Sequence, residues 1–191
     1  MYRFYQFLWK IGRVIGLNLN LAYYRIMSSL LGYKLGQGCV FYGRIRFGSC
    51  GYGIAIGNNC SLGDQSFLSV CSGAKLVLED RVSFNTGCHI VACESIKIGA
   101  GTAIGEYVTI RDQNHKTAGS SGGINGQGYS VKPVVVGKNV WIGRGCYIGA
   151  GVCIGDGAVI GANSVVVKSI PANGVAVGAP AKVIKLNTNT S

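Results

Sequence analysis

One histidine of this chain stands where it could take part in proton chemistry. The chain has two histidines: His115, at the base of a long polar segment, and His89, which we interpret as an outward-facing residue. An imidazole titrates near neutral pH, so it can take the proton of an attacking hydroxyl group. His115 is therefore a candidate general base, and the alternative is an ordinary surface histidine. No acidic residue lies between Lys116 and Pro133, which leaves Asp112 or a backbone carbonyl to orient the ring.

The eight cysteines do not form a metal-binding pattern. No C-x-x-C pair occurs, and the cysteines are scattered along the chain. No cluster of histidine, cysteine and carboxylate has the spacing of a metal site, so we expect no metal. We interpret the cysteines as small hydrophobic core residues and not as disulfides, which fits a reducing cytoplasm.

The elements that must position these residues follow a six-residue repeat. From Val136 to Gly161, an aliphatic residue followed by glycine returns at every sixth position. This period fits neither a helix nor a half-buried strand, but it fits a solenoid in which three six-residue sides close one triangular coil. The aliphatic side chain would fill the axis, and the glycine would let the backbone turn a corner. The same phase runs back to Leu35 and forward to Val166, which predicts about six coils.

The repeat divides the chain into three parts. Residues 1–34 form an N-terminal arm, residues 35–168 carry the coils, and residues 169–191 form a basic segment with a polar tail that we expect to fray. Within the coils, residues 111–133 have no inward aliphatic series and are rich in glycine, serine and asparagine. This segment must leave the prism as a loop, and loops of this length usually carry function.

The N-terminal arm is apolar, aromatic and basic. Residues 2–17 predict an amphipathic helix, and residues 19–35 continue this arm over the first coil. One face carries Arg3, Gln6, Lys10 and Arg13, and the other carries Phe4, Phe7, Leu8, Ile11, Val14 and Ile15. Two of these basic residues interrupt the apolar run, so we expect neither a membrane span nor a signal peptide. Two interpretations stay open: residues 1–17 lie on an anionic membrane, or they pack on this or a neighbouring solenoid.

The net charge of +11, from 18 Lys and Arg against 7 Asp and Glu, narrows the choice of partners. No acidic residue precedes Asp64 and none follows Asp156, so both ends of the chain are purely basic. Such a surface suits an anionic membrane or a phosphate-bearing ligand. No nucleic-acid-binding motif accompanies the charge, so we expect no nucleic acid partner.

Five segments of the chain resemble the hexapeptide-repeat acyltransferases, most of all their galactoside, maltose and xenobiotic acetyltransferase branch. The segments are RVSFNTGCHIV, VTIRDQNH, VWIGRG, VIGANSVVVKSIP and VGAPAKVIK. The resemblance spans roughly residues 36–185. It implies an all-β solenoid, a left-handed parallel β-helix, which assembles as a homotrimer with active sites between subunits and takes acetyl-CoA as the acyl donor.

The same resemblance assigns roles to particular residues. It places the general base at His115 and an acceptor-binding asparagine at Asn85, whose alternative role is to stabilise a corner. Arg144 replaces a small polar residue of the family and keeps a backbone N–H for the thioester oxygen, while Val167 replaces a hydroxyl residue. Three lysines match basic positions near the CoA phosphates, and their alternative role is to solvate the tail. The cofactor-binding residues that the resemblance implies are Gly143, Arg144, Ala162, Val167, Lys168, Lys182 and Lys185.

We therefore expect an acetyl-CoA-dependent O-acetyltransferase that acts on a sugar hydroxyl during the synthesis of capsule, lipopolysaccharide or another surface polysaccharide. The basic aromatic arm replaces the acceptor-binding N-terminal segment of the family. This replacement predicts a lipid-linked saccharide as acceptor and a cytoplasmic protein that contacts the inner face of the membrane. Two further classes stay open. One is an enzyme that N-acetylates an amino-sugar or acetylates a xenobiotic, such as the hydroxyl group of an antibiotic; the other is a hexapeptide scaffold without catalysis.

Overall fold

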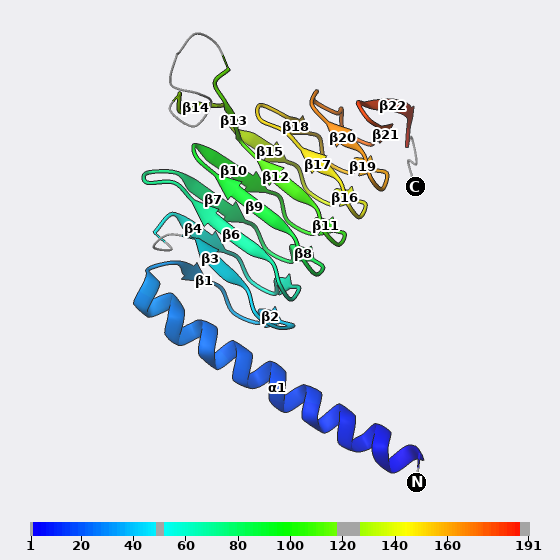
Figure 1. Ribbon diagram of the computed structural model, residues 1–191. Helices are drawn as coiled ribbons and strands as arrows, with labels where there is room; N and C mark the ends of the chain where they lie inside the picture. Colours follow the sequence, from blue (N-terminus) through cyan, green and yellow to red (C-terminus); the bar gives the residue numbers. More distant parts are fainter. Residues whose placement is uncertain (1, 49–51, 118–126, 188–191) are drawn as a thin grey trace.

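A prism of short parallel strands follows one long helix. The computed structural model describes residues 2–48, 52–117 and 127–187, with the backbone alone for residues 2–13. Helix α1 (Tyr2–Leu31) precedes the prism, and each coil of the prism contributes strands to the three sheets that form its sides (Figure 1). The fold is a left-handed parallel β-helix of about six coils, which confirms the prediction from the repeat and the resemblance.

Strands of successive coils pair in register, so each sheet runs along the prism. Sheet A consists of β1 (Lys34–Leu35), β4 (Ile54–Ile56), β7 (Lys75–Leu78), β10 (Ser95–Ile98), β15 (Val134–Val136) and β18 (Cys153–Ile154). Sheet B consists of β2 (Val40–Phe41), β5 (Ser61–Leu62), β8 (Ser83–Phe84), β11 (Ala103–Ile104), β16 (Trp141–Ile142), β19 (Val159–Ile160), β21 (Gly174–Gly178) and β22 (Ala181–Leu186). Sheet C consists of β3 (Arg46–Gly48), β6 (Phe67–Val70), β9 (His89–Ala92), β12 (Thr109–Arg111), β17 (Tyr147–Ile148) and β20 (Val165–Val166).

The inward side chains of the repeat form the core. Leu78, Phe84 and Ile90 point inward from the three sides of one coil, and all three are buried. Each stacks on its equivalent in the next coil, as Phe84 does on Ile104. The corners are as tight as the repeat predicts, because a Cβ atom on Gly63 would collide with the backbone of the coil above it.

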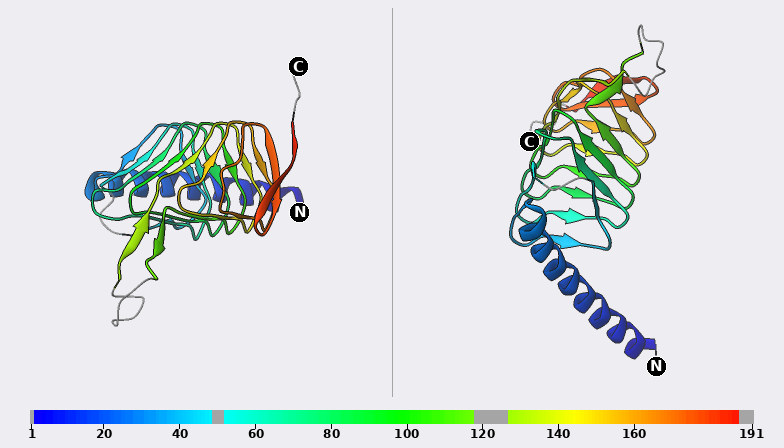
Figure 2. Two further views of the ribbon diagram at one scale, coloured as in Figure 1. Left: turned by 90° about the horizontal axis from the view of Figure 1, so that it is seen from above. Right: turned by 60° about the vertical axis from the view of Figure 1, so that its left-hand side comes forward.

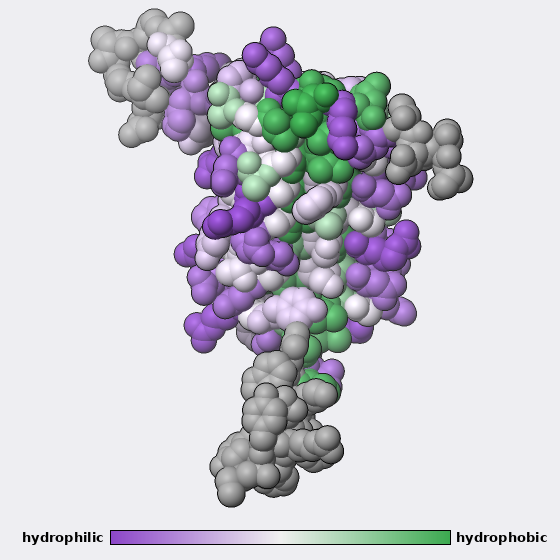
Figure 3. Space-filling view, turned by 90° about the vertical axis from the view of Figure 1, so that its right-hand side faces the viewer, coloured by the Kyte–Doolittle hydropathy of each residue, from purple (hydrophilic) through white to green (hydrophobic). Residues whose placement is uncertain are grey.

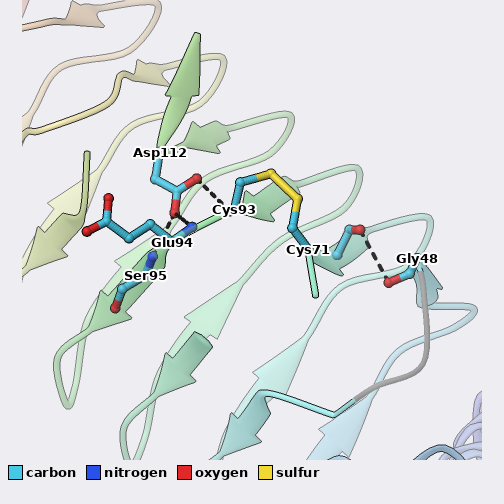
Figure 4. Close-up of a disulfide and its surroundings, with 7 residues drawn as sticks. Gly48, Cys71, Cys93, Glu94, Ser95 and Asp112 are labelled. Atoms are coloured by element: carbon cyan, nitrogen blue, oxygen red, sulfur yellow. Dashed lines mark hydrogen bonds between the residues drawn. A yellow bond between two sulfur atoms is a disulfide. The ribbon is translucent and has the colours of Figure 1, made fainter. Parts of the chain in front are cut away.

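The cysteine prediction is correct for some residues and wrong for two. Cys71 and Cys93 form a disulfide between adjacent coils (Figure 4). They lie 22 residues apart, about one coil, so the repeat stacks them at one corner with their Cα atoms 4.6 Å apart. The cysteines buried in the core as small hydrophobic residues are Cys39, Cys60, Cys88 and Cys146, whereas Cys153 is exposed and Cys50 lies outside the described residues. Burial raises the pKa of the Cys88 thiol to about 11, so this thiol stays protonated.

The second half of α1 covers the N-terminal end of the prism. Tyr24 is 2% exposed, and its ring stacks on Phe41 with the ring centroids 4.1 Å apart. Its hydroxyl group donates a hydrogen bond to the carbonyl oxygen of Gly43 (3.1 Å) and accepts one from the backbone N–H of Ile45 (2.6 Å). The helix thus covers apolar surface and strand edges of the first coil that would otherwise face solvent. Its N-terminal half extends past the end of the prism (Figure 2), and the side chains of residues 1–13, which the amphipathic prediction used, lie outside the described residues.

One segment leaves the prism, as predicted for residues 111–133. Its two ends pair as an antiparallel hairpin of β13 (Gln113–His115) and β14 (Tyr129–Val131), in which His115 faces Tyr129. The hairpin stands out from the side of the prism where sheet C turns into sheet A (Figures 1 and 2). The part of the predicted loop from 118 to 126 lies outside the described residues.

Candidate active site

Asn85 interrupts a column of glycines at the corner between sheets B and C. The residue after the inward side chain at this corner is Gly63 on the preceding coil and Gly105 on the next. Asn85 follows Phe84 in the equivalent position, and its side chain is exposed. Its Nδ2 atom donates a hydrogen bond to Oε1 of Glu106 on the next coil (2.8 Å). The corner therefore presents an amide fixed by a carboxylate, and both groups can bind hydroxyl groups.

A pocket of about 400 Å³ opens at this corner. Asn85 lines it together with Gly143, Arg144 and Ala162, so the structure brings the acceptor-binding candidate and three donor-binding candidates into one pocket. Trp141 also lines the pocket and is 60% exposed on the outer face of sheet B. The pocket thus combines polar groups at the corner with an aromatic wall, as small-molecule sites commonly do.

Arg144 lines this pocket, and its backbone N–H forms no hydrogen bond with another described residue. At the same corner of the first coil, the N–H of Arg44 donates a hydrogen bond to Oδ1 of Asp64 on the next coil (2.6 Å). The residue above Arg144 is Ala162, whose side chain has no acceptor, and within the described ranges this N–H has no protein partner. A free N–H in the wall of a pocket can stabilise an oxygen that gains negative charge during a reaction.

His115 lies at a different corner, between sheets C and A. Asn85 precedes sheet C on its coil, whereas His115 follows sheet C on the next coil, so the whole width of that side separates the two residues. The imidazole is exposed, and its ring centroid lies 4.6 Å from that of Tyr129 across the hairpin. His115 therefore does not line the pocket of Asn85 in the same chain.

Asp112 anchors the hairpin and does not orient the imidazole. Its side chain is fully buried, and its carboxylate accepts hydrogen bonds from three consecutive backbone N–H groups of the preceding coil (Figure 4). These belong to Cys93 (2.7 Å, to Oδ1), Glu94 (2.8 Å, to Oδ2) and Ser95 (2.8 Å, to Oδ2). The backbone carbonyl of Asp112 also accepts the N–H of Lys132 on the returning strand (2.8 Å). Charge-assisted hydrogen bonds thus fix the root of the hairpin that carries His115.

The other four candidates lie outside the pocket of Asn85. Val167 and Lys168 follow β20 at the corner between sheets C and A, on the edge of sheet C that also carries the His115 hairpin. Lys182 and Lys185 stand on β22, which ends sheet B through an antiparallel pairing with β21. All four residues are exposed. The predicted site residues therefore lie in three places: the corner between sheets B and C, the corner between sheets C and A, and the end of sheet B. A single chain does not bring them together.

Two pocket residues, Glu106 and Trp141, were missed in the sequence. The sequence did hold a sign of Glu106. The chain has only 7 acidic residues, and Glu106 is the one that lies one coil after Asn85 in the repeat. Trp141 occupies an outward position of a strand, where the period constrains only the inward residue. Nothing in the repeat distinguishes it from other exposed strand residues.

Comparison with known proteins places the chain among acyltransferases. The family model described as "Bacterial transferase hexapeptide (six repeats)" matches residues 133–168. A protein named as a lipopolysaccharide biosynthesis O-acetyl transferase, WbbJ of Escherichia coli (strain K12), is 36% identical over 141 residues, which cover 69% of this chain and 71% of WbbJ.

Two solved structures have similar folds. The polysialic acid O-acetyltransferase OatWY is 25% identical, with a TM-score of 0.66 over 81% of this chain and 74% of that chain. A mutant of AntD, an N-acyltransferase from Bacillus cereus in complex with dTDP-4-amino-4,6-dideoxyglucose and coenzyme A, has a TM-score of 0.74 over 85% of this chain and 88% of its own. At 21% identity, AntD shows the fold alone.

Replacement of the buried carboxylate should loosen the hairpin. In the wild type, the two oxygens of Asp112 accept hydrogen bonds from three N–H groups, and Asp112→Asn leaves only one oxygen to accept them. We therefore expect the free energy of local opening to fall by about 1–3 kcal/mol. Hydrogen exchange of the amides in 113–117 and 127–132 should become faster by about tenfold or more. Glu94→Gln is the matched control, because Glu94 contributes only its backbone N–H. Equal exchange rates in Asp112→Asn and wild type would show that the carboxylate does not hold the hairpin.

Proposed function

The chain belongs to the bacterial hexapeptide-repeat transferases and is an acyltransferase, and from this premise we propose an acetyl-CoA-dependent O-acetyltransferase that acts on the hydroxyl group of a saccharide. The observation that carries the proposal is the pocket where Asn85, Glu106 and the free N–H of Arg144 meet. The names of WbbJ and OatWY refer to lipopolysaccharide biosynthesis and to polysialic acid, which supports an acceptor in surface-polysaccharide synthesis.

In the proposed reaction the acetyl group passes directly from donor to acceptor. His115 takes the proton of the acceptor hydroxyl while the hydroxyl oxygen attacks the carbonyl carbon of the thioester. The carbonyl oxygen gains negative charge and accepts a hydrogen bond from the N–H of Arg144. The carbon–sulfur bond then breaks, and the CoA sulfur leaves with the proton that the imidazolium returns. Asn85, held by Glu106, binds the acceptor next to the reacting oxygen.

We propose that each active site takes His115 from one copy of the chain and Asn85 from the next. In one chain the two residues lie at opposite edges of sheet C, and His115 stands on a hairpin that projects from the prism (Figure 2). A contact between the hairpin of one copy and the Asn85 corner of another is head-to-tail, and such contacts form a ring when the rotation between copies closes. Together with the family resemblance, this supports a homotrimer.

The donor would extend from the pocket along the outer face of sheet B. Hydrophobic side chains gather near the C-terminal end of the molecule (Figure 3), and Val177 and Val183 there are 38% and 42% exposed. These side chains offer apolar contact for the pantetheine arm, and Lys182 and Lys185 on β22 offer charge for the phosphates. Val167 and Lys168 would complete the groove from the second copy, because they share the edge of sheet C that carries the hairpin.

We also propose that α1 lies on an anionic membrane. An apolar stripe runs beside the face of α1 that packs on the first coil, and each of its residues is more than half exposed: Ile15, Leu19, Tyr23, Ile26 and Leu30. The helix carries Arg3, Lys10, Arg13 and Arg25 and no acidic residue, so its charge complements anionic lipid. Among the described residues, no helix is both long and apolar enough to span a bilayer.

Removal of the proposed base should slow the reaction and spare donor binding. We expect His115→Ala to lower acetyl transfer by about a hundredfold or more, in line with the loss of a general base. CoA release from acetyl-CoA is the measurement, with mono-, di- and lipid-linked saccharides as acceptors. Lys116→Ala, an exposed neighbour on the same hairpin segment, is the matched control. Unchanged turnover in His115→Ala would refute the assignment.

A charge within the apolar stripe should weaken membrane binding. We expect Ile15→Glu to reduce co-sedimentation with anionic vesicles by about tenfold, because the stripe loses apolar contact and would bury a carboxylate. Asn18→Glu adds the same charge at an exposed polar position outside the stripe and should have a smaller effect. Equal binding of the Ile15→Glu variant and wild type would count against membrane contact through the stripe, and equal binding to zwitterionic and anionic vesicles would count against a role for the basic charge.

A further inference from the structure

Two arginines of the first coil connect a pair of neighbouring pockets. One pocket, of about 650 Å³, lies between α1 and the first coil and is lined by Leu19, Tyr23, Arg44 and Arg46 among others. The second, of about 510 Å³, shares both arginines and continues along the prism to His89 and Tyr107. A continuous depression therefore leads from the helix toward the coil of Asn85.

The lining of both pockets is cationic. Among the residues that the structure describes, no carboxylate lines either of them. The nearest acid along the corner, Asp64, uses Oδ1 to accept the backbone N–H of Arg44. The guanidinium of Arg46 lies over the ring of Phe67, 5.7 Å from its centroid, and in the described part of the chain neither guanidinium forms an ion pair. Two exposed guanidinium groups without a carboxylate partner are well suited to phosphate oxygens, which they can bind in a bidentate manner.

The arginines stand at a defined distance from the proposed reaction. Arg44, Asp64 and Thr86 stack at one corner on three successive coils, because Gln65 N–H donates to the carbonyl of Arg44 and Gly87 N–H donates to that of Asp64. Thr86 directly follows Asn85. Two coil spacings of about 4.8 Å therefore place Arg44 roughly 10 Å from the Asn85 corner along the prism. A short saccharide that reacts at Asn85 can reach the arginines with a group attached to its reducing end.

We propose that Arg44 and Arg46 bind the diphosphate of a saccharide diphosphate, which is the acceptor class of this enzyme. The inference rests on the proposed function, because it assumes that the reacting hydroxyl lies at Asn85. Both lipid-linked and nucleotide-linked sugars carry a diphosphate. The apolar and aromatic wall that α1 contributes, with Leu19 and Tyr23, offers contact for whatever group lies beyond the phosphates.

Direct binding separates this inference from the acetyl transfer itself. Isothermal titration with inorganic pyrophosphate should give binding that weakens by about tenfold or more in the double variant Arg44→Gln/Arg46→Gln, since each charged hydrogen bond is worth about a factor of ten. Binding should persist in His115→Ala. Arg81→Gln, which removes one positive charge at an exposed arginine outside both pockets, is the control for a general effect of charge and should bind pyrophosphate as the wild type does. If pyrophosphate binds through the arginines but no acetyl transfer occurs, the proposed function fails and the site stands.

Kinetics then identify the source of the diphosphate. The double variant should raise KM by about tenfold or more for a UDP-sugar or for a polyprenyl-diphosphate saccharide, and leave kcat and the KM for acetyl-CoA unchanged. The acceptor whose KM rises identifies the carrier of the diphosphate. The KM for a methyl glycoside, which has no phosphate, should not change. Equal pyrophosphate binding by the double variant and wild type overturns the proposal. The proposal is also overturned if the double variant sediments as a smaller species than the wild type, because the arginines would then lie in a contact between copies.

Discussion

The hydrogen-bonded register between coils is the constraint on which the rest of this structure depends. Each coil repeats the one below it, so residues far apart in the sequence stack at a single corner. At the corner between sheets B and C, the N–H of Gly63 donates to the carbonyl of Phe84 (2.8 Å), and the N–H of Asn85 donates to that of Ile104 (3.0 Å). A shift of one residue in the pairing between coils would turn inward side chains outward, and the residues that line the pocket at Asn85 would no longer lie together.

The register explains which features the sequence could predict. A period of six determines the inward side chains, the corners and the departure of 111–133, because each depends on local spacing. The disulfide of Cys71 with Cys93 and the bond of Asn85 to Glu106 depend on which outward side chains meet between coils, and the period does not constrain those. Asp112 stood in the sequence as a possible partner of His115, but burial turned its carboxylate toward the backbone of the preceding coil.

The same geometry divides the candidate site between two places. Asn85, Gly143, Arg144 and Ala162 share one corner, whereas His115 stands beyond the opposite edge of sheet C. A prism cannot fold one corner onto another, so its shape favours an active site between copies. In the proposed assembly, the hairpin root fixed by Asp112 gives the reach and direction of the imidazole. The proposed diphosphate site at Arg44 and Arg46 and the proposed membrane contact of α1 would then lie on the acceptor side.

Subunit complementation tests the central claim most directly. His115→Ala and Asn85→Ala, each inactive alone, are dissociated, mixed in equal amounts and reassembled, and acetyl transfer is then measured. If every site draws His115 from one copy and Asn85 from the next, random assembly restores about a quarter of the sites and hence of the wild-type rate. A mixture as inactive as its parents, although it reassembles and binds CoA, would show that both residues act from one chain.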